Sequence, residues 1–459
     1  MAGHGFSHEP QNVPHVFTDY RTIRTAIPVP KSIPLLQKMY DTESRSMHGQ
    51  MPIIWDRAEG FQVHDPWGNT WIDFSSTIFV ANAGHGNPRI VEALRKVLDK
   101  PLLHTYTYAS PERIDYLEYL IENTPSQFEK AFLLSAGTEA TEAAFKLMRL
   151  NGQKNGKKQN GIICFDGAYH GRTVGAQMMT GSEAARAWIG YHDPEIHHLP
   201  FPYPWESGQT SPEKFFQDTM AQLLEGKGLE PSTDLCGFML ETYQGWGGIF
   251  YPDEFVKELV DYAHEHGMLV AFDEMQAGFG RTGELFGYMH YGVEPDLLCC
   301  GKGASSSLPL SIVLGSQEVM DLPDVGSMSS THSANPLSCV AGKANLEVLL
   351  EDGLIANSKN LGIVLHRNLN QIKARFPEHL AHVEGRGLLA GLIFMSPDGI
   401  PLSSLCDKVS ELCLQRGLLV VHTGRESIKL APPLIIHEEA LLEGLSVLES
   451  AIEEVIDSE

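Results

Sequence analysis

Five short runs of almost uninterrupted apolar residues recur through the middle of the chain, at residues 131–135, 161–165, 236–240, 268–272 and 296–300. Strands buried on both faces of a parallel sheet have this continuous apolarity, whereas half-solvated strands alternate apolar and polar residues. Helical patterns lie between the runs, for example over 139–150 and 252–266. The alternation of strands and helices predicts an α/β fold built on a parallel sheet.

The length of the chain, 459 residues with 42% hydrophobic residues, is enough for one large domain and a smaller one. An antiparallel strand pair is expected around 60–64 and 70–74. Strand candidates near 387–391 and 417–421 lie among helical patterns at 341–350, 403–415 and 438–456. We therefore expect residues 76–325 to form the large domain, and residues 1–75 and 326–459 to contribute to the smaller one.

The charge composition of the chain argues against nucleic acid as a binding partner. The 34 Lys and Arg residues and 58 Asp and Glu residues give a formal net charge of −24, which repels nucleic-acid phosphates. This charge would attract a cationic substrate, although solubility alone also accounts for it. No signal-peptide pattern or stretch of about 20 apolar residues occurs, so we expect a cytoplasmic protein without membrane partners. The seven cysteines show no CxxC spacing, the histidines form no ligand cluster, and no metal site is expected.

Polar and glycine residues follow the apolar runs, at the sheet edge where ligands of α/β proteins bind. After the first run, Gly137 and Thr138 begin a helix whose backbone N–H groups would face an anion such as phosphate. After the second run, Tyr169 and His170 offer a flat aromatic face. Each feature alone has a plain structural explanation as a turn, a helix cap or core packing.

Asp273 directly follows the fourth run, and Lys302 follows the fifth between two glycines. A lysine at an apolar sheet end has a lowered pKa, which gives the neutral amine that a Schiff base requires. For these two residues alone, an Asp273–Lys302 salt bridge is the simpler interpretation. The full set of anion turn, aromatic face, carboxylate and amine instead matches the requirements of pyridoxal 5′-phosphate.

A longer segment makes the resemblance specific. Residues 270–283, VAFDEMQAGFGRTG, resemble the signature of the class III (ω-type) aminotransferases of fold type I. Residues 135–143 resemble the phosphate-binding turn of that family, and residues 169–173 resemble its ring-stacking segment. Lys302 stands 29 residues after Asp273, and Thr331 a further 29 residues on, in the family's order and spacing. The resemblance runs from about Gly60 to Leu434.

The resemblance implies a large domain with a mostly parallel seven-stranded sheet flanked by helices, and a smaller α+β domain from both termini. Lys302 would form the internal aldimine with the cofactor and then shuttle the substrate proton. Asp273 would keep the pyridine nitrogen protonated, and Gln276 would bond the phenolic oxygen.

The remaining implied cofactor contacts are Tyr169 and His170 at the ring and Gly137 with Thr138 at the phosphate. Thr331 would reach the phosphate of the neighbouring subunit. That last contact implies a homodimer with shared active sites.

The chain departs from the family at its substrate-binding positions. Many members carry a Glu and an Arg that together govern recognition of a substrate carboxylate, and here the resemblance places Trp246 and Lys429 at these positions. Lysine cannot make the planar bidentate contact of arginine, so ordinary recognition of glutamate is not expected. Trp246 either forms a flat wall for a ring-shaped substrate or packs in the core. Ile78 and Phe79 align with the family's substrate-facing loop.

The expected reaction is aminotransfer between a primary amine and a keto acid or other carbonyl acceptor. The acidic composition and the missing carboxylate pair favour a polyamine, a diamine or an amino sugar such as an aminoglycoside as donor. Racemisation, epimerisation or decarboxylation of an amino acid or amino sugar is the alternative, because Lys302 and the cofactor's electron sink serve all of these reactions. A GxGxxG pattern at 278–283 fits dinucleotide binding, but Phe279 and Arg281 within it argue against that function.

Overall fold

The computed structural model describes residues 6–49, 51–205 and 210–458. The chain divides into two compact units: unit 1 comprises residues 1–87, 246–248 and 354–459, and unit 2 comprises 88–245 and 249–353. These divisions fall later in the chain than the expected 75/76 and 325/326. The physical reason is that helices α3 (Pro88–Leu98) and α12 (Pro336–Glu351) pack against each other within unit 2.

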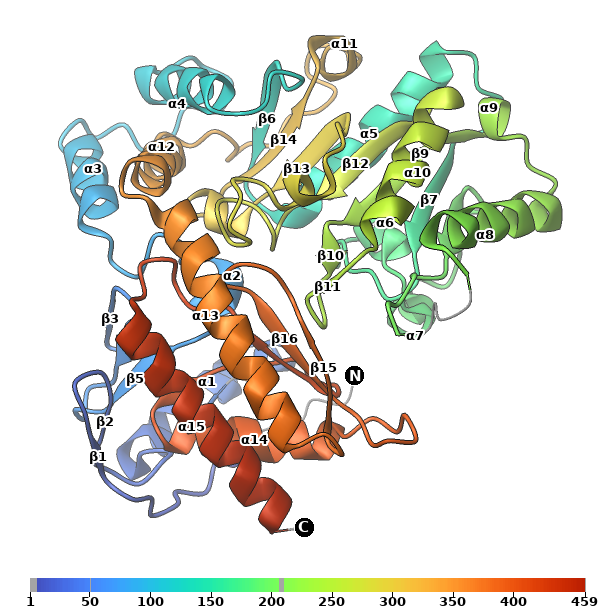
Figure 1. The fold of residues 1–459 in the computed structure, drawn as a ribbon. Coiled ribbons are helices and arrows are strands. Elements are labelled where there is room, and N and C mark those ends of the chain that lie inside the picture. The colour runs from blue at the N-terminus through green and yellow to red at the C-terminus, as the bar shows by residue number, and fades with distance from the viewer. Residues whose placement is uncertain (1–5, 50, 206–209, 459) are drawn as a thin grey trace. The chain divides into compact units, whose positions relative to one another are not determined.

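Unit 2 is built on a seven-stranded sheet with the strand order β6-β14-β13-β12-β9-β7-β8 (Figure 1). The strands are β6 (Lys130–Leu134), β7 (Gly161–Phe165), β8 (Ile196–Leu199), β9 (Leu235–Glu241), β12 (Leu269–Asp273), β13 (Leu297–Cys300) and β14 (Ser311–Gly315). All neighbours are parallel except β14, which is antiparallel to both β13 and β6. The predicted mostly parallel seven-stranded sheet is confirmed, and the five apolar runs coincide with β6, β7, β9, β12 and β13.

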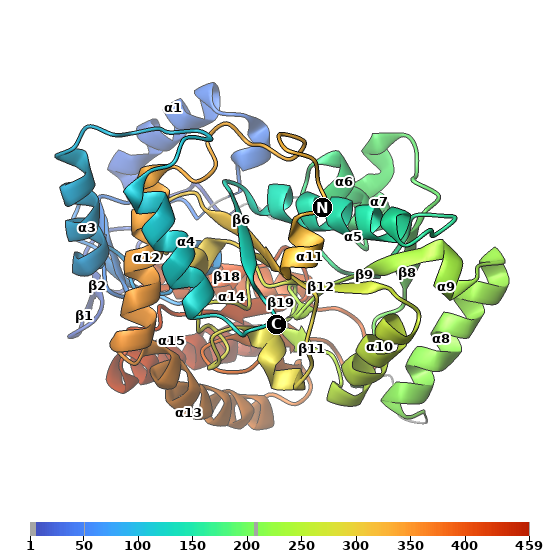
Figure 2. The same cartoon turned by 90° about the horizontal axis from the view of Figure 1, so that it is seen from above.

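Helices cover both faces of this sheet. Helix α5 (Gly137–Lys154) lies on one side, and α8 (Pro212–Lys227) and α10 (Asp253–Glu265) lie on the other (Figure 2). Leu269 and Ala271 of β12 belong to the same core cluster as the buried face of α5. On the opposite face, Phe216 of α8 contacts Phe238 of β9. Because successive strand residues point to opposite faces, burial on both sides explains why the runs are apolar throughout.

Shorter elements complete unit 2. The helices are α4 (Pro111–Glu122), α6 (Val174–Met179), α7 (Glu183–Arg186), α9 (Pro231–Asp234) and α11 (Gln317–Met320), with 3-10 turns η3 (Ala187–Ile189), η4 (Gly287–Tyr291) and η5 (Lys302–Ala304). Strands β10 (Tyr243–Gln244) and β11 (Ile249–Phe250) form a hairpin.

Unit 1 contains two sheets. The first has the order β1-β2-β5-β4-β3, with β17 beside β5, and the second has the order β15-β16-β19-β18. The strands are β1 (Val16–Phe17), β2 (Thr22–Ile23), β3 (Arg57–Glu59), β4 (Gln62–His64), β5 (Thr70–Asp73), β15 (Leu380–Glu384), β16 (Ala390–Phe394), β17 (Leu418–Leu419), β18 (Val421–His422) and β19 (Ser427–Leu430). Since β17 pairs with β5, segments from both ends of the sequence share one sheet.

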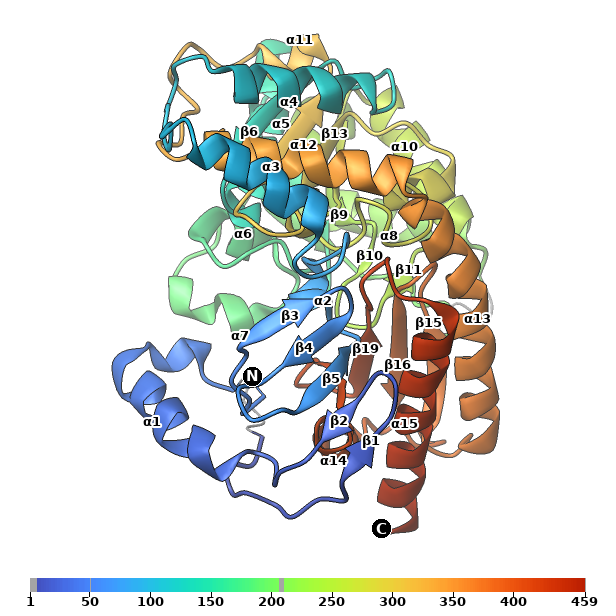
Figure 3. The same ribbon diagram turned by 90° about the vertical axis from the view of Figure 1, so that its left-hand side faces the viewer.

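Helices α13 (Leu354–Arg375) and α15 (Glu438–Asp457) of unit 1 lie side by side (Figure 3). The other helices of the unit are α1 (Ile33–Thr42), α2 (Ser76–Phe79) and α14 (Ser403–Gln415), with 3-10 turns η1 (Pro30–Ser32) and η2 (Arg45–Met47). Among the described residues, no helix is both long and apolar enough to cross a membrane. All seven cysteines are buried free thiols.

Candidate active site

The carboxyl edge of the seven-stranded sheet collects the residues predicted to bind a cofactor. Asp273 is the last residue of β12, and Lys302 lies two residues beyond β13. In the register of the sheet, Asp273 pairs with Glu241 of β9 on one side and with Cys299 of β13 on the other. Parallel neighbours that end at the same edge therefore place these side chains together.

Asp273 takes a histidine rather than the lysine as its partner. The Oδ2 atom of Asp273 lies 2.9 Å from His170 Nδ1, and the Oδ1 atom accepts a hydrogen bond of 3.0 Å from the backbone N–H of Met275. Both side chains are buried. Within the described part of the chain no carboxylate forms an ion pair with Lys302, so the simple salt-bridge interpretation does not describe this site. Each carboxylate oxygen keeps a further lone pair for a protonated ring nitrogen.

Lys302 lies in a strained and partly buried position. Its φ of 46° is in the left-handed region, which residues with a side chain rarely adopt outside functional sites. Burial lowers the pKa of the Lys302 amine, while Asp273 and Glu241 act in the opposite direction. A lowered pKa increases the fraction of neutral, nucleophilic amine at physiological pH.

Gly137 and Thr138 are the first two residues of α5, where the helix dipole favours an anion. The side chain of Glu139 accepts hydrogen bonds from the N–H groups of Ser135 (2.9 Å) and Ala136 (2.8 Å), which fixes the turn before the helix. A Cβ at Gly137 would lie 2.9 Å from the sulfur of Met275, so a larger residue there would have to displace the Met275 side chain. The glycine therefore allows the helix start to approach the turn after β12.

Tyr169 lies in the turn after β7, with its side chain 40% exposed. The guanidinium of Arg172 lies 5.5 Å from the centre of the ring. The backbone N–H of Tyr169 donates a 3.1 Å hydrogen bond to Glu241 Oε2. Gln276 lies beside Gly245, since a Cβ on that glycine would be 2.6 Å from Gln276 Nε2.

Thr331 is exposed, and its carbonyl accepts a hydrogen bond from His104 Nε2 at 2.8 Å. The preceding Ser330 donates to Glu139 Oε1 at 3.1 Å, so this segment lies near the start of α5. The expected contact of Thr331 concerns a second subunit and stays a prediction.

The four predicted substrate residues all belong to unit 1. Ile78 and Phe79 lie in α2, which is a left-handed turn: φ is 47° at Ser76, 51° at Thr77, 60° at Ile78 and 70° at Phe79. Left-handed conformation at a β-branched residue is a strong outlier. Ser76 Oγ holds the turn in place by donating a 2.6 Å hydrogen bond to the carbonyl of Ala431. As a result, Phe79 is buried and Ile78 is half exposed.

Three of the four predicted substrate residues take part in cation–aromatic contacts. Lys429 Nζ lies 4.5 Å from the ring centre of Phe79, and the guanidinium carbon of Arg425 lies 4.0 Å from the ring centre of Trp246. Ser427, between the two cations in sequence, donates a 2.8 Å hydrogen bond to the carbonyl of Trp246. The guanidinium of Arg425 therefore covers one face of the partly buried Trp246 ring, and the role of the ring as a pocket wall or as core packing stays a prediction.

The family of the chain follows from comparison with known proteins. The model of the class III aminotransferases matches residues 44–452, nearly the whole chain. The chain is a class III aminotransferase. This result confirms the predicted family, the enzyme class and the fold type I architecture.

Relatives of this aminotransferase differ in the reaction that their names state. The chain is 32% identical to a 4-aminobutyrate aminotransferase of Mycobacterium leprae, over 93% of this chain and 97% of that protein. It is 29% identical to an alanine/serine racemase of Pyrococcus horikoshii, over 98% of this chain and 96% of that protein. A solved (S)-enantioselective ω-transaminase from Thermomicrobium roseum superimposes with a TM-score of 0.83 at 27% identity, covering 92% of this chain and 98% of that one.

Class III aminotransferases use pyridoxal 5′-phosphate, and the residues of unit 2 fit this cofactor. The start of α5 supplies N–H groups for a phosphate, and the glycines at 137 and 301 let the Met275 side chain pack against both segments, since a Cβ would lie 2.9 Å and 2.5 Å from its sulfur. Asp273 is a buried carboxylate suited to a pyridinium nitrogen, and Lys302 supplies the amine for the aldehyde. The residue roles taken from the family stay predictions.

Two residues of this aminotransferase were not singled out from the sequence. Glu241 ends a strand as Asp273 does, so a carboxylate directly after an apolar run was the available signal. Arg425 lies four residues before Lys429 in a turn, and nothing in its spacing distinguishes it from a surface arginine.

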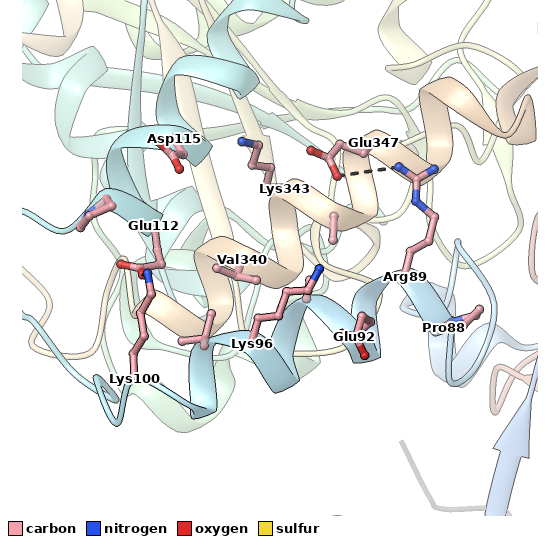
Figure 4. Close-up of a pocket in the computed structure, with 14 residues that line it drawn as sticks. Pro88, Arg89, Glu92, Lys96, Lys100, Glu112, Asp115, Val340, Lys343 and Glu347 are labelled. Atoms are coloured by element: carbon pink, nitrogen blue, oxygen red, sulfur yellow. Dashed lines mark hydrogen bonds and ion pairs between the residues drawn. The ribbon is translucent and has the colours of Figure 1, made fainter.

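A groove between α3, α4 and α12 lies apart from these residues (Figure 4). Its volume is about 710 Å³, and four cationic and four carboxylate side chains line it. Arg89 pairs with Glu347 at 3.8 Å, and Lys100 with Glu112 at 3.0 Å. Because its charges balance, the groove offers no net attraction to a phosphate, and none of the predicted cofactor residues lines it.

Proposed function

We propose that this enzyme transfers an amino group from a primary amine to a carbonyl acceptor that carries a carboxylate, such as a keto acid. The observation that carries the proposal is the surroundings of Lys302. An amine with a lowered pKa lies on the same sheet edge as a buried carboxylate that a histidine, not the lysine, holds in place.

Each residue has a defined task in this proposal. Bound pyridoxal phosphate supplies an electron sink that stabilises negative charge at the substrate carbon. Lys302 would hold the cofactor through its aldehyde and would move the proton of the substrate carbon. Asp273, oriented by His170, would hold a proton on the ring nitrogen, and Tyr169 would stack on the ring. Gln276 would donate to the phenolic oxygen, while Gly137 and Thr138 would bind the phosphate.

Arg425 and Lys429 support an anionic acceptor. The ring of Trp246 and the carboxylate of Glu426, which lies 2.8 Å from Arg425 Nη2, keep the Arg425 guanidinium in one orientation, and its Nη1 group would donate to the acceptor carboxylate. Lys429 adds a second positive charge on the same strand as Ser427. We propose that this pair takes over from the Glu and Arg found in other members of the family.

The donor is proposed to be a polyamine, a diamine or an amino sugar such as an aminoglycoside. The net charge of −24 supports a cationic donor. This proposal is compatible with an anionic acceptor, because an aminotransferase handles donor and acceptor in separate half-reactions. A cytoplasmic homodimer in which Thr331 completes the neighbouring active site is part of the same proposal.

Racemisation is the second candidate, supported by the relative named as an alanine/serine racemase. Both reactions need Lys302 and Asp273, and they differ in whether the amino group leaves the substrate. Decarboxylation needs the same residues and is distinguished by loss of carbon dioxide.

The visible absorption of the protein supplied with pyridoxal phosphate tests the proposal. Wild type, Lys302→Ala and the control Lys343→Ala, which removes a lysine of the groove between α3, α4 and α12, are each mixed with ω-amino acids, diamines, polyamines, aminoglycosides and alanine. We expect the visible band of wild type and Lys343→Ala to bleach with at least one amine, as the cofactor gains its amino group. In Lys302→Ala the rate of bleaching should be at least about 100-fold lower, on the scale of general acid–base catalysis.

The outcomes separate the candidates. A band that no amine bleaches, together with deuterium uptake from solvent into an amino acid, would replace aminotransfer by racemisation. Rates with ω-amino acids far above those with polycationic amines would remove the polyamine and amino-sugar proposal while leaving aminotransfer intact.

A further inference from the structure

Glu241, the last residue of β9, is a buried carboxylate without an assigned role. Only 5% of the residue is exposed, and it lies opposite Asp273 in the register of the sheet. A buried carboxylate is costly unless hydrogen bonds satisfy it, so its partners indicate its use.

The two oxygens of Glu241 hold two separate backbone segments. Oε2 accepts a hydrogen bond from the N–H of Tyr169 at 3.1 Å, and Oε1 accepts one from the N–H of Gly245 at 3.2 Å. Tyr169 follows β7, and Gly245 follows β10. Only an ionised carboxylate accepts freely at both oxygens, because a protonated acid or an amide presents a donor on one side.

Both segments end at predicted cofactor contacts. The Tyr169 ring is the expected stacking partner of the cofactor. Gly245 lies between Glu241 and Gln276, since a Cβ on this glycine would be 2.6 Å from Glu241 Oε1 and 2.6 Å from Gln276 Nε2. The Glu241 carboxylate thus connects the Tyr169 segment to Gly245. Gly245 in turn lies beside Gln276, the residue expected to bond the phenolic oxygen of the cofactor.

We propose that Glu241 is a positioning residue for the cofactor, whose ionised carboxylate holds the Tyr169 turn and the Gly245 backbone at the spacing that the bound ring requires. The proposal rests on the cofactor being pyridoxal phosphate, and it does not depend on the identity of the amine or the acceptor.

The charge state of Glu241 makes this positioning depend on pH. Burial raises the pKa of Glu241 to about 7, Asp273 also raises it, and His170 and the two backbone hydrogen bonds lower it. The titratable groups that interact with Glu241 from the surrounding segments are His170, Asp273, Lys302, Tyr243 and Tyr251. As the pH falls through about 7, one oxygen gains a proton and one backbone contact weakens. The affinity for the cofactor should therefore decrease as the pH falls.

Glu274, the residue that follows Asp273 in the chain, provides a matched control. It is fully buried, and burial raises its pKa to about 7 as well. Its oxygens accept hydrogen bonds from the N–H groups of Gly287 (2.8 Å) and Tyr288 (2.7 Å) and from the hydroxyl of Thr242, instead of from Tyr169 and Gly245. Glu274→Gln therefore removes a similar buried charge while both hydrogen bonds of Glu241 stay in place.

The experiment measures the Kd of pyridoxal phosphate by quenching of tryptophan fluorescence, from pH 6 to 9, for wild type, Glu241→Gln and Glu274→Gln. Circular dichroism checks the fold of each variant. We expect Glu241→Gln to weaken binding about tenfold at pH 8, the effect of losing one charge-assisted hydrogen bond. Ionisation of the cofactor phosphate affects all three proteins alike. Wild type and Glu274→Gln should therefore lose affinity more steeply below pH 7 than Glu241→Gln.

Equal Kd values and parallel pH curves for the two glutamine variants would overturn the proposal. If Glu241→Gln does not fold, Glu241→Asp carries the test, because it keeps the charge and shortens the reach. Weaker binding of pyridoxal phosphate by Glu241→Asp, with the pH dependence of wild type retained, supports the proposal. Binding by Glu241→Asp equal to that of wild type overturns it. The failure of every amine in the turnover test would leave these Kd measurements unaffected.

Discussion

Arg425 and Lys429 are the residues proposed to bind the carboxylate of the acceptor. Lys429 lies over Phe79 rather than taking the place of an arginine, and the guanidinium of unit 1 that lies over Trp246 belongs to Arg425. Stacking on the Trp246 ring restricts the Arg425 guanidinium, whose Nε and Nη2 groups donate to the carboxylate of Glu426. The guanidinium thus has a cation–π contact to Trp246 in addition to an ion pair with Glu426.

Arg425→Ala should raise the KM for a keto acid acceptor about tenfold or more, the scale of losing a charged hydrogen-bonding partner. The half-reaction with a donor that lacks a carboxylate should change by less than about twofold, because it does not use this contact. Steady-state kinetics with separately varied donor and acceptor provide the measurement. The control is Arg375→Ala, which removes an exposed arginine that pairs with Glu449 and Glu453 on the same unit. An equal effect of both variants would contradict the assignment.

At the residue scale, the sequence predicts the positions of the functional residues better than it predicts their hydrogen-bonding partners. Lys302 and Asp273 were predicted because both follow apolar runs, and their common sheet edge follows from the parallel register. The hydrogen bond between His170 and Asp273 joins residues 103 positions apart, and no local pattern encodes it. Glu241 was missed for a related reason, since the role proposed for it depends on hydrogen bonds from two backbone groups that any residue type could supply.

At the element scale, local burial made the strands predictable and long-range pairing did not. The five apolar runs gave β6, β7, β9, β12 and β13 within about a residue at each end. The sequence did not predict that β14 inserts antiparallel between β6 and β13, because the order of strands depends on contacts between distant segments. Nor did it predict that residues 246–248, inside a hairpin of unit 2, belong to unit 1.

Gly391 in β16 is the element-scale feature that admits residues 246–248. A Cβ on Gly391 would lie 1.7 Å from the carbonyl oxygen of Gly247, so Gly391→Ala must displace that segment. We expect a loss of roughly 1–3 kcal/mol in the free energy of unfolding, as for other overpacked sites. Gly226→Ala in α8 meets nothing within 4 Å, and it should be neutral or stabilising by up to about 1 kcal/mol. Urea unfolding of both variants measures the difference, and similar effects would contradict the packing argument.

At the scale of the whole molecule, the buried carboxylates should link stability to pH. Burial raises the pKa values of both Glu241 and Glu274 from 4.5 to about 7, so the folded protein binds more protons than the unfolded chain between these values. The stability that these groups contribute is therefore fully present below about pH 4.5 and is lost as the pH rises through about 7. Each contribution is on the order of 3 kcal/mol at most.

The melting temperature of the cofactor-free enzyme should accordingly fall between pH 6 and pH 8, and the fall should be smaller in Glu274→Gln, which has one titrating group fewer. Added pyridoxal phosphate should oppose this slope, because a ligand that binds the folded state stabilises it and we expect this one to bind best when Glu241 is ionised. In Glu241→Gln, the shift in melting temperature caused by a fixed cofactor concentration should depend less on pH than in Glu274→Gln. Thermal melts with and without cofactor at pH 6, 7 and 8 test both expectations. A cofactor-induced shift in wild type that is largest at pH 6 would contradict the coupling between Glu241 and the bound cofactor.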